Sequence, residues 1–164
     1  MASGASGTES ARRRRRTTVA LKESLRELRN QLSLLNHQVG GRLNLKDVDL
    51  DCLELISTGG PLSPSALARR AGLHPATVTG ILDRLQRGGW VVRERDPDAA
   101  DRRAVTVRAV PGRTLELFRV YGGMNSAMDE LCAGYTEDEL VLIAGFLRRT
   151  AEAGRAATDE LSAE

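Results

Sequence analysis

Proline and glycine divide the middle of the chain into two short helices separated by a tight turn. Residues 63–64 (Ser-Pro) and 74–75 (His-Pro) each place a polar residue before a proline, a pattern that begins a helix. Gly72 is expected to end the first helix, and residues 88–89 (Gly-Gly) the second. The spacing therefore predicts a helix, a tight turn and a second helix within about thirty residues.

The segment after the second helix predicts a β-hairpin. Val91 and Val92 follow Trp90, and valines alternate with other residues from 105 to 110. Its arginines are Arg93, Arg95, Arg102, Arg103 and Arg108. Such a basic finger can reach into a DNA minor groove, whose negative potential attracts arginine. The alternative is a solvated loop in which Asp96, Asp98 and Asp101 pair with these arginines.

Helices are also expected on both sides of this middle segment. One carries an apolar seam with alternating spacings of four and three residues: Leu21, Leu25, Leu28, Leu32, Leu35 and Val39. This spacing is typical of a helix that packs on another helix, and Gly40 and Gly41 are expected to end it. A short helix is expected between about residue 47 and Gly59. Residues 111–164 predict two more helices, the second beginning with a capping box of Thr136 and Glu139.

The predicted fold is mainly α with a small β-hairpin wing. Residues 47–110 would form a winged helix-turn-helix lobe, between an N-terminal dimerisation helix at 18–46 and C-terminal dimerisation helices at 111–164. Residues 1–17 lack apolar side chains that could be buried and are expected to form a disordered basic tail. Their run of five arginines, residues 12–16, either follows DNA phosphates or is a silent flexible segment.

Charge is distributed unevenly, although the net charge is only +2. Residues 1–60 carry 10 basic and 7 acidic side chains, residues 61–110 carry 9 and 5, and residues 111–164 carry 5 and 10, giving segment nets of +3, +4 and −5. A basic middle segment indicates a polyanionic partner such as nucleic acid. The alternative is an ordinary scatter of charge over a solvated surface.

The second predicted helix has the side chains that a major-groove helix requires. Val78, Ile81, Leu82 and Leu85 form its apolar stripe. Small or hydrogen-bonding residues remain for the other face: His74, Ala76, Thr77, Thr79, Gly80 and Arg84. Free backbone N–H groups at its start are expected to bind a phosphate. The alternative is an ordinary amphipathic core helix.

The sequence offers little for catalysis, metal binding or cofactors. It contains two histidines, His37 and His74, and no HxxxH or CxxC spacing, so an enzyme is not expected. Cys52 and Cys132 are read as small buried apolar residues rather than redox sensors. No apolar run approaches about 18 residues, and a cytoplasmic location is expected.

The run LSPSALARRAGLHPATVTGILDRLQRGGWVVRERDP at residues 62–97, followed by DRRAVTV at 101–107, resembles the DNA-binding core of the MarR family of transcription regulators. The resemblance covers residues 50–112 and implies that Asp83 pairs with Arg103, beside Asp101, to brace the wing. It also implies that Arg102 enters the minor groove and that Arg84 approaches the DNA backbone. The sequence departs from the family pattern at Gly80, where a larger polar residue is common, and at Ala99 and Ala100, which lengthen the wing.

The resemblance further implies a homodimeric repressor that a small molecule releases from a palindromic operator. Possible ligand-contacting residues between the dimerisation helices and the DNA-binding lobe are Asn36, His37, Arg42, Tyr121 and Met124, although all five could simply be packing or surface residues. Two alternatives remain: a winged helix that docks on another protein, and a ligand-independent DNA-architectural protein.

Overall fold

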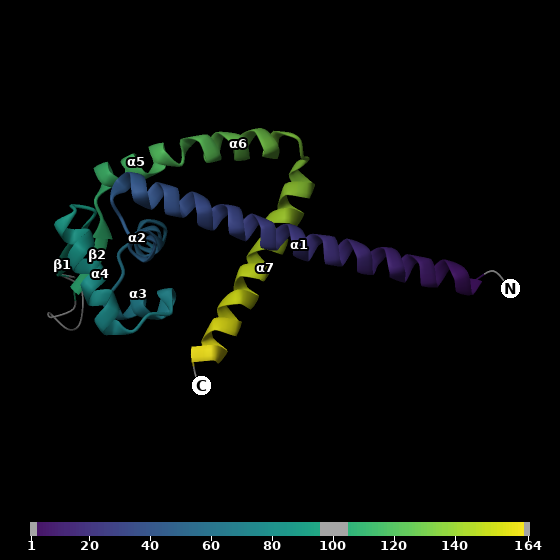
Figure 1. Ribbon diagram of the computed structural model, residues 1–164, viewed down its shortest axis with the longest axis horizontal. Helices are drawn as coiled ribbons and strands as arrows, with labels where there is room; N and C mark the ends of the chain where they lie inside the picture. The colour runs from purple at the N-terminus through teal and green to yellow at the C-terminus, as the bar shows by residue number, and fades with distance from the viewer. Residues whose placement is uncertain (1–2, 96–104, 163–164) are drawn as a thin grey trace. The chain divides into compact units, whose positions relative to one another are not determined.

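The computed structural model describes residues 3–95 and 105–162, with side chains placed for residues 8–95 and 105–161. The chain divides into two compact units, residues 1–44 and residues 45–164. The first unit consists of the helix α1 (Ser3–Leu43). The second unit (Figure 1) contains α2 (Asp47–Gly59), α3 (Pro64–Ala71), α4 (Pro75–Arg87), β1 (Val91–Arg95), β2 (Val105–Ala109), α5 (Pro111–Val120), α6 (Gly122–Ala133) and α7 (Glu137–Ser162).

Helix α1 differs from the expectation at both ends. It begins at Ser3, so the disordered tail expected at residues 1–17 is helical from that residue onward. Alanine and arginine are strong helix formers, and this local preference outweighs the lack of buried apolar surface. The helix also continues through Gly40 and Gly41 to Leu43. A single glycine costs only about 1 kcal/mol in a helix, and the helix ends where Asn44 adopts a left-handed conformation with φ 56°.

The two short helices begin and end as the sequence predicts. The hydroxyl of Ser63 accepts a hydrogen bond from the backbone N–H of Ala66 at 3.2 Å and caps α3. The imidazole Nδ1 of His74 accepts from the N–H of Ala76 at 3.2 Å and caps α4. Gly72 ends α3 with φ 63°, a left-handed conformation that glycine adopts without steric cost. The turn between the two helices is therefore set by local chemistry.

Helices α2, α3 and α4 pack together with the hairpin around one aliphatic core. The α4 stripe predicted from the sequence is buried in full, with Val78, Ile81, Leu82 and Leu85 at most 1% exposed. The other buried residues of α2, α3 and the hairpin segment are Leu50, Cys52, Leu53, Ile56, Leu62, Leu67, Ala68, Trp90, Val91 and Val107. Because one face of α4 is committed to this core, the other face is left for solvent or a partner.

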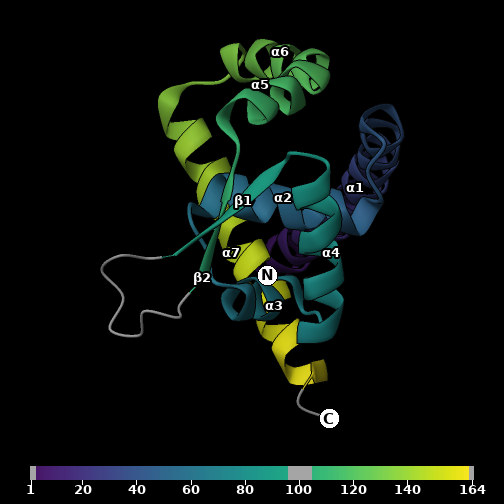
Figure 2. The ribbon, with the colours of Figure 1, turned by 90° about the vertical axis from the view of Figure 1, so that its left-hand side faces the viewer.

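Strands β1 and β2 form the expected antiparallel hairpin, in which Val91 pairs with Ala109 and Arg95 with Val105 (Figure 2). Val110, expected in the second strand, instead precedes α5 as its N-cap. The sequence analysis missed a β-bridge between Leu62 and Val107, with N–O distances of 3.0 and 2.8 Å. This bridge attaches the hairpin to the segment before α3.

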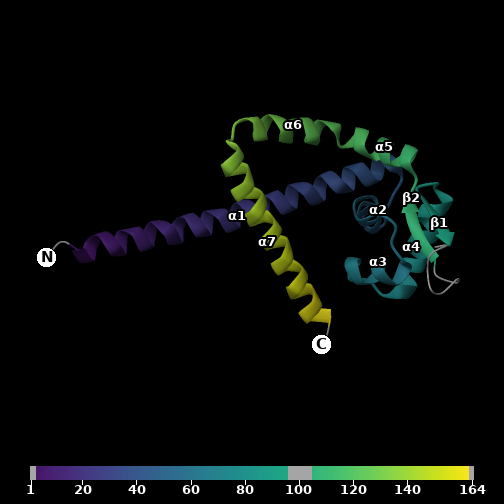
Figure 3. The same ribbon diagram turned by 180° about the vertical axis from the view of Figure 1, so that it is seen from behind.

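The C-terminal part contains three helices rather than the expected two (Figure 3). The first expected helix is interrupted at Tyr121, immediately before Gly122 and Gly123. A side chain on Gly122 would meet no atom within 4 Å, so close packing does not explain this glycine. The capping box of α7 is confirmed: the N–H of Thr136 donates to Glu139 at 2.8 Å, and the N–H of Glu139 donates to the Thr136 hydroxyl at 3.4 Å. No helix among the described residues is long and apolar enough to cross a membrane.

Candidate nucleic-acid interface

The exposed face of α4 carries small and polar side chains at its N-terminal end. His74, Ala76, Thr77 and Thr79 are exposed, and Gly80 is half-buried. The hydroxyl of Thr79 donates to the carbonyl of Pro75 at 3.1 Å, which leaves its oxygen able to accept. A helix that presents such residues can bring its backbone close to the base edges of a major groove.

The backbone N–H groups expected to be free at the start of α4 are already bonded. Ala76 donates to the His74 side chain, and Thr77 and Val78 donate to the His74 carbonyl at 2.9 and 3.2 Å. Pro75 has no N–H to offer. The expectation of a phosphate site built from free N–H groups is therefore wrong, because one capping residue satisfies the whole first turn.

Arg84 is held by a residue that the sequence analysis missed. Its Nε donates to Oδ2 of Asp49 at 2.8 Å, and its Nη2 donates to Oδ1 at 2.5 Å. Asp49 is only 2% exposed, and its hydrogen bond to the guanidinium raises the pKa of Arg84. This bidentate pair ties α4 to α2. Sequence spacing could not reveal it, because an aspartate in a first helical turn is also explained by the helix dipole.

The strands of the hairpin carry two ion pairs. Nη2 of Arg93 lies 2.7 Å from Oδ1 of Asp83, which connects β1 to α4. Nη2 of Arg108 lies 2.5 Å from Oε1 of Glu94, and this hydrogen bond lowers the pKa of Glu94. Two arginines of the basic finger therefore have acidic partners, and neither partner is Asp96, Asp98 or Asp101. Arg95 is exposed.

The tip of the wing lies outside the described residues. This applies to Arg102 and Arg103, to Asp101, and to Ala99 and Ala100. The pairing of Asp83 with Arg103 stays a prediction. The described partner of Asp83 is Arg93, which braces the base of the hairpin. The resemblance had instead implied a partner for Asp83 at the tip of the wing.

The junction between the lobe and α5 is also tied down. The guanidinium of Arg113 lies 4.0 Å from the centre of the Trp90 ring, and its Nη2 donates to the carbonyl of Gly88 at 3.1 Å. Arg113 also pairs with Glu116 on the next turn of α5. Stacking on a tryptophan face and a backbone hydrogen bond together fix the start of α5 against the end of α4.

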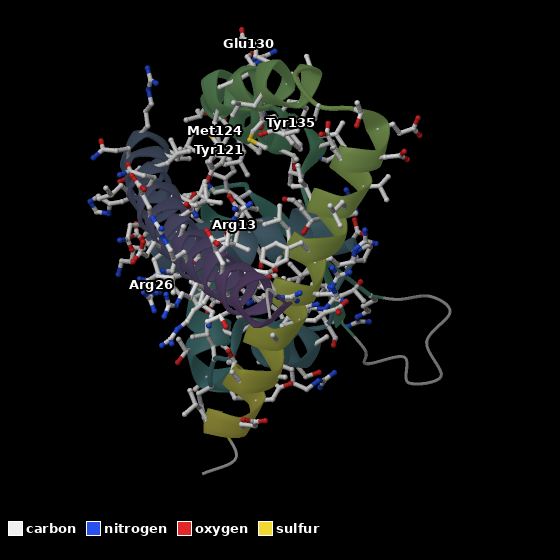
Figure 4. The ribbon with its side chains drawn as sticks, turned by 90° about the vertical axis from the view of Figure 1, so that its right-hand side faces the viewer. Arg13, Arg26, Tyr121, Met124, Glu130 and Tyr135 are labelled. Carbon is white, nitrogen blue, oxygen red and sulfur yellow. The ribbon has the colours of Figure 1, made fainter. Side chains whose placement is uncertain are left out.

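The proposed ligand-contacting residues fall in different units. Asn36, His37 and Arg42 lie on α1, whereas Tyr121 and Met124 lie at the α5–α6 junction (Figure 4). The Tyr121 hydroxyl donates to Oε1 of Glu54 at 2.7 Å. Burial, followed by this hydrogen bond, raises the pKa of Tyr121. Sequence reasoning did not single out Glu54, whose position on α2 carries no motif.

A hollow of about 510 Å³ lies between α2 and the turn after α3. Cys52 contributes to its wall but is fully buried, and burial raises the pKa of this thiol to about 11, helped by the charges of Asp51 and Asp49. The other residues that line the hollow are Val48, Asp51, Glu54, Leu55, Thr58, Ala71 and Leu73. A neutral, buried thiol is unreactive, which agrees with reading Cys52 as a packing residue.

Comparison with known proteins places this site in a known family. The family model described as "MarR family" matches residues 45–105, from the start of α2 to the second strand of the hairpin. The chain is 31% identical over 121 residues to the uncharacterised HTH-type transcriptional regulator YcgE of Bacillus subtilis, covering 73% of this chain and 77% of that protein. The chain belongs to the MarR family.

Two further similarities extend this result. The HTH-type transcriptional repressor YetL of Bacillus subtilis is 31% identical over 78 residues, 48% of this chain and 46% of that protein. The structure of a MarR family protein from Bacillus stearothermophilus superposes with a TM-score of 0.64 at 20% identity, covering 85% of this chain and 96% of the other. The protein is thus a DNA-binding transcription regulator of the MarR family, not an enzyme. Its winged helix-turn-helix consists of α3, α4 and the β1–β2 hairpin.

Proposed function

We propose that this MarR-family protein is a cytoplasmic, homodimeric repressor that binds an inverted-repeat operator and is released from it by a small molecule. The observation that carries the proposal is the division of α4 into two faces. One face is buried in the core, and the other exposes His74, Ala76, Thr77 and Thr79 beside a hairpin that carries arginines. This is the arrangement required by a helix that reads base edges.

The proposed DNA contacts follow from exposure. His74, Ala76, Thr77, Thr79 and Gly80 face the bases of the major groove. Arg95, together with Arg102 at the wing tip, contacts the minor groove and its phosphates. Asp83 braces the wing, with Arg93 as the described partner and with Asp101 and Arg103 as further members. Arg84 positions α4 rather than binding phosphate, because Asp49 already occupies its guanidinium.

Dimerisation is supported by apolar surface on helices outside the DNA-binding lobe. Leu117 is the one buried hydrophobic side chain among the described residues of α5, α6 and α7. Large apolar side chains on these helices remain exposed: Leu115, Phe118, Met128, Leu131, Val141, Leu142, Ile143 and Leu147. On α1, Leu21, Leu28 and Leu32 of the predicted seam are also exposed. Surface of this kind favours association with a second copy through α1 and α5–α7.

Two observations support repression and release by an effector. YetL is named as a repressor, and its similarity to this chain favours the same role here. The hollow beside α2 has a volume typical of small-molecule sites, and its lining residue Glu54 binds Tyr121 of the α5–α6 junction. A molecule that entered this hollow and displaced Tyr121 would act on both the lobe and the C-terminal helices.

Selection of DNA fragments by the purified protein, with and without cell extract, tests this proposal. The expected result is an inverted repeat with half-sites about one helical turn, roughly 34 Å, apart, whose binding weakens in extract. Sedimentation at micromolar concentration should show a dimer. Selected sites without dyad symmetry, or a monomer with normal helicity, would contradict the homodimeric operator. Failure to enrich any duplex would favour a protein-docking role for the winged helix.

A further inference from the structure

Helix α1 carries an excess of positive charge that the operator-binding lobe does not explain. Its 41 residues contain nine basic and three acidic side chains, a net charge of +6. The basic residues are Arg12 to Arg16, Lys22, Arg26, Arg29 and Arg42. All of α1 lies before residue 45, where the match to the family model begins. The charge on α1 is therefore an addition to the shared DNA-binding core.

Five of these basic residues form a stripe along one side of α1. At about 100° per residue, Arg12, Arg15, Lys22, Arg26 and Arg29 fall within an arc of about 100°. This basic stripe is about 26 Å long at 1.5 Å per residue, and its centre is about 130° around the helix from the leucine seam. Arg13 and Arg14 lie outside the stripe. Figure 4 shows Arg13 and Arg26 leaving the helix on different sides.

The residues of the stripe are exposed, and none has an ion-pair partner among the described residues. The side chains of Arg12, Arg15, Lys22, Arg26 and Arg29 are all exposed. None of these five residues takes part in the ion pairs that the described part of the chain shows between Asp49 and Glu116. Glu9, Glu23 and Glu27 lie beside the stripe rather than within it.

Concentrated positive charge on one helix is unfavourable until something neutralises it. Like charges three or four residues apart destabilise a helix by about 0.2–0.5 kcal/mol per pair, and residues 12–16 contain three such pairs. A polyanion bound along the stripe would neutralise these charges and remove the repulsion. Binding would also release counterions from the polyanion, which favours association.

We infer that the basic stripe of α1 binds the phosphate backbone of duplex DNA and adds affinity that does not depend on base sequence. This inference rests on the proposed function, because the stripe would assist a protein that already binds DNA through α4. The charge and the length of the stripe match a row of phosphates, which repeats about every 3.4 Å along one strand. Arginine is also the side chain best suited to phosphate.

Two other partners fit the stripe less well. A membrane-surface helix would bury its apolar face in the bilayer, whereas the leucine seam of α1 is proposed to pack on another helix. The acidic helix α7 of a second copy is the other candidate. However, three of the six acidic residues of α7, Glu137, Asp138 and Glu139, lie in its first turn, where the helix dipole already stabilises them. Two more, Glu152 and Asp159, follow an arginine by four residues on the same helix. The observations therefore favour DNA.

Two pairs of neighbouring substitutions test the inference on the full-length protein. Arg12→Gln/Arg15→Gln removes two charges from the stripe, and Arg13→Gln/Arg14→Gln removes two charges of the same kind from outside it. Glutamine has a helix propensity close to that of arginine, so both variants should stay helical. The probes are the selected operator and a random-sequence duplex of equal length. The affinity for each is measured against salt concentration, and circular dichroism and sedimentation check the fold and the dimer.

The stripe variant should bind both duplexes more weakly, and the slope of log K against log salt should fall by about 1.8, since each phosphate contact contributes about 0.9. The off-stripe variant should lose less than half as much. Equal losses in the two variants, or no loss in either, would overturn the inference. So would a stripe variant whose dimer dissociates more readily while its salt slope is unchanged, because the stripe would then bind a second copy. Wild-type protein that binds no duplex would refute the proposed function instead.

Discussion

The ion pair between Arg84 and Asp49 provides a direct test of how α4 is held. Asp49 is 2% exposed and accepts both hydrogen bonds from one guanidinium, so Arg84→Ala leaves a buried carboxylate without its cation. Truncating one partner of a buried pair costs about 3–5 kcal/mol. The Arg84 side chain is 35% exposed, so water can reach the vacated space, and we expect a loss of about 2–3 kcal/mol.

Urea denaturation at a fixed protein concentration measures this loss, which corresponds to a fall in melting temperature of roughly 5–10 °C for a chain of this size. Arg87→Ala is the matched control: this arginine is exposed on the same helix and donates its Nε to the backbone of Asp83 at 3.2 Å. The control should change stability by less than about 0.5 kcal/mol. Asp49→Leu/Arg84→Met should be less harmful than Arg84→Ala, because it removes both charges.

The same variants separate a positioning role from a phosphate contact. If Arg84 only positions α4, Arg84→Ala lowers operator affinity without changing the salt dependence of binding. If Arg84 leaves Asp49 to bind phosphate, the slope of log K against log salt falls by about 0.9. A stable Arg84→Ala protein with a reduced slope would refute the reasoning from the Asp49 pair and would restore the backbone contact implied by the family resemblance.

Other residues give shorter tests. Gly80→Ala should raise the free energy of unfolding by about 0.5–1 kcal/mol, since the new Cβ would meet only Nη1 of Arg84 at 3.7 Å. The same substitution should weaken operator binding, because the added methyl group would hold α4 away from the bases. Unchanged affinity would exclude Gly80 from the interface. Because the pKa of Cys52 is raised from 9.0 to about 11, its thiol should be alkylated at pH 8 about 100-fold more slowly in the folded than in the unfolded chain. The stability that the neutral thiol contributes is complete below pH 9.0 and is lost as the pH rises to about 11. Between pH 8 and 10.5, the melting temperature should therefore decrease more steeply with pH for the wild type than for Cys52→Ala. Asp83→Ala and Arg93→Ala should each lower the free energy of unfolding by less than about 1 kcal/mol. A double mutant whose loss equals the sum of the two single losses would refute the brace. Tyr121→Phe should lower the free energy of unfolding by about 1 kcal/mol, as measured by urea denaturation. An unchanged value would mean that the hydrogen bond from the Tyr121 hydroxyl to Glu54 contributes nothing to stability.

Local sequence chemistry determined the helix-turn-helix and the identity of its buried face. Ser63 and His74 begin their helices, Gly72 ends one, and the spacing of Val78, Ile81, Leu82 and Leu85 assigns one side of α4 to the core. Each of these features depends on residues a few positions apart. The exposed face of α4 then follows by elimination, which is why its small and polar residues could be named from the sequence.

Only the tertiary structure decided which charged residues meet. Asp49 and Arg84 are 35 positions apart, Tyr121 and Glu54 are 67 apart, and nothing in their spacing marks them as partners. The same holds for Asp83, whose described partner is Arg93 on the adjacent strand. Secondary structure depends on periodicity and capping within a few residues, whereas an ion pair depends on how separate elements pack. The sequence therefore identified the helix with an exposed face of small and polar residues, and the packing of α2 and the hairpin against this helix determined which of its charged side chains remain unpaired.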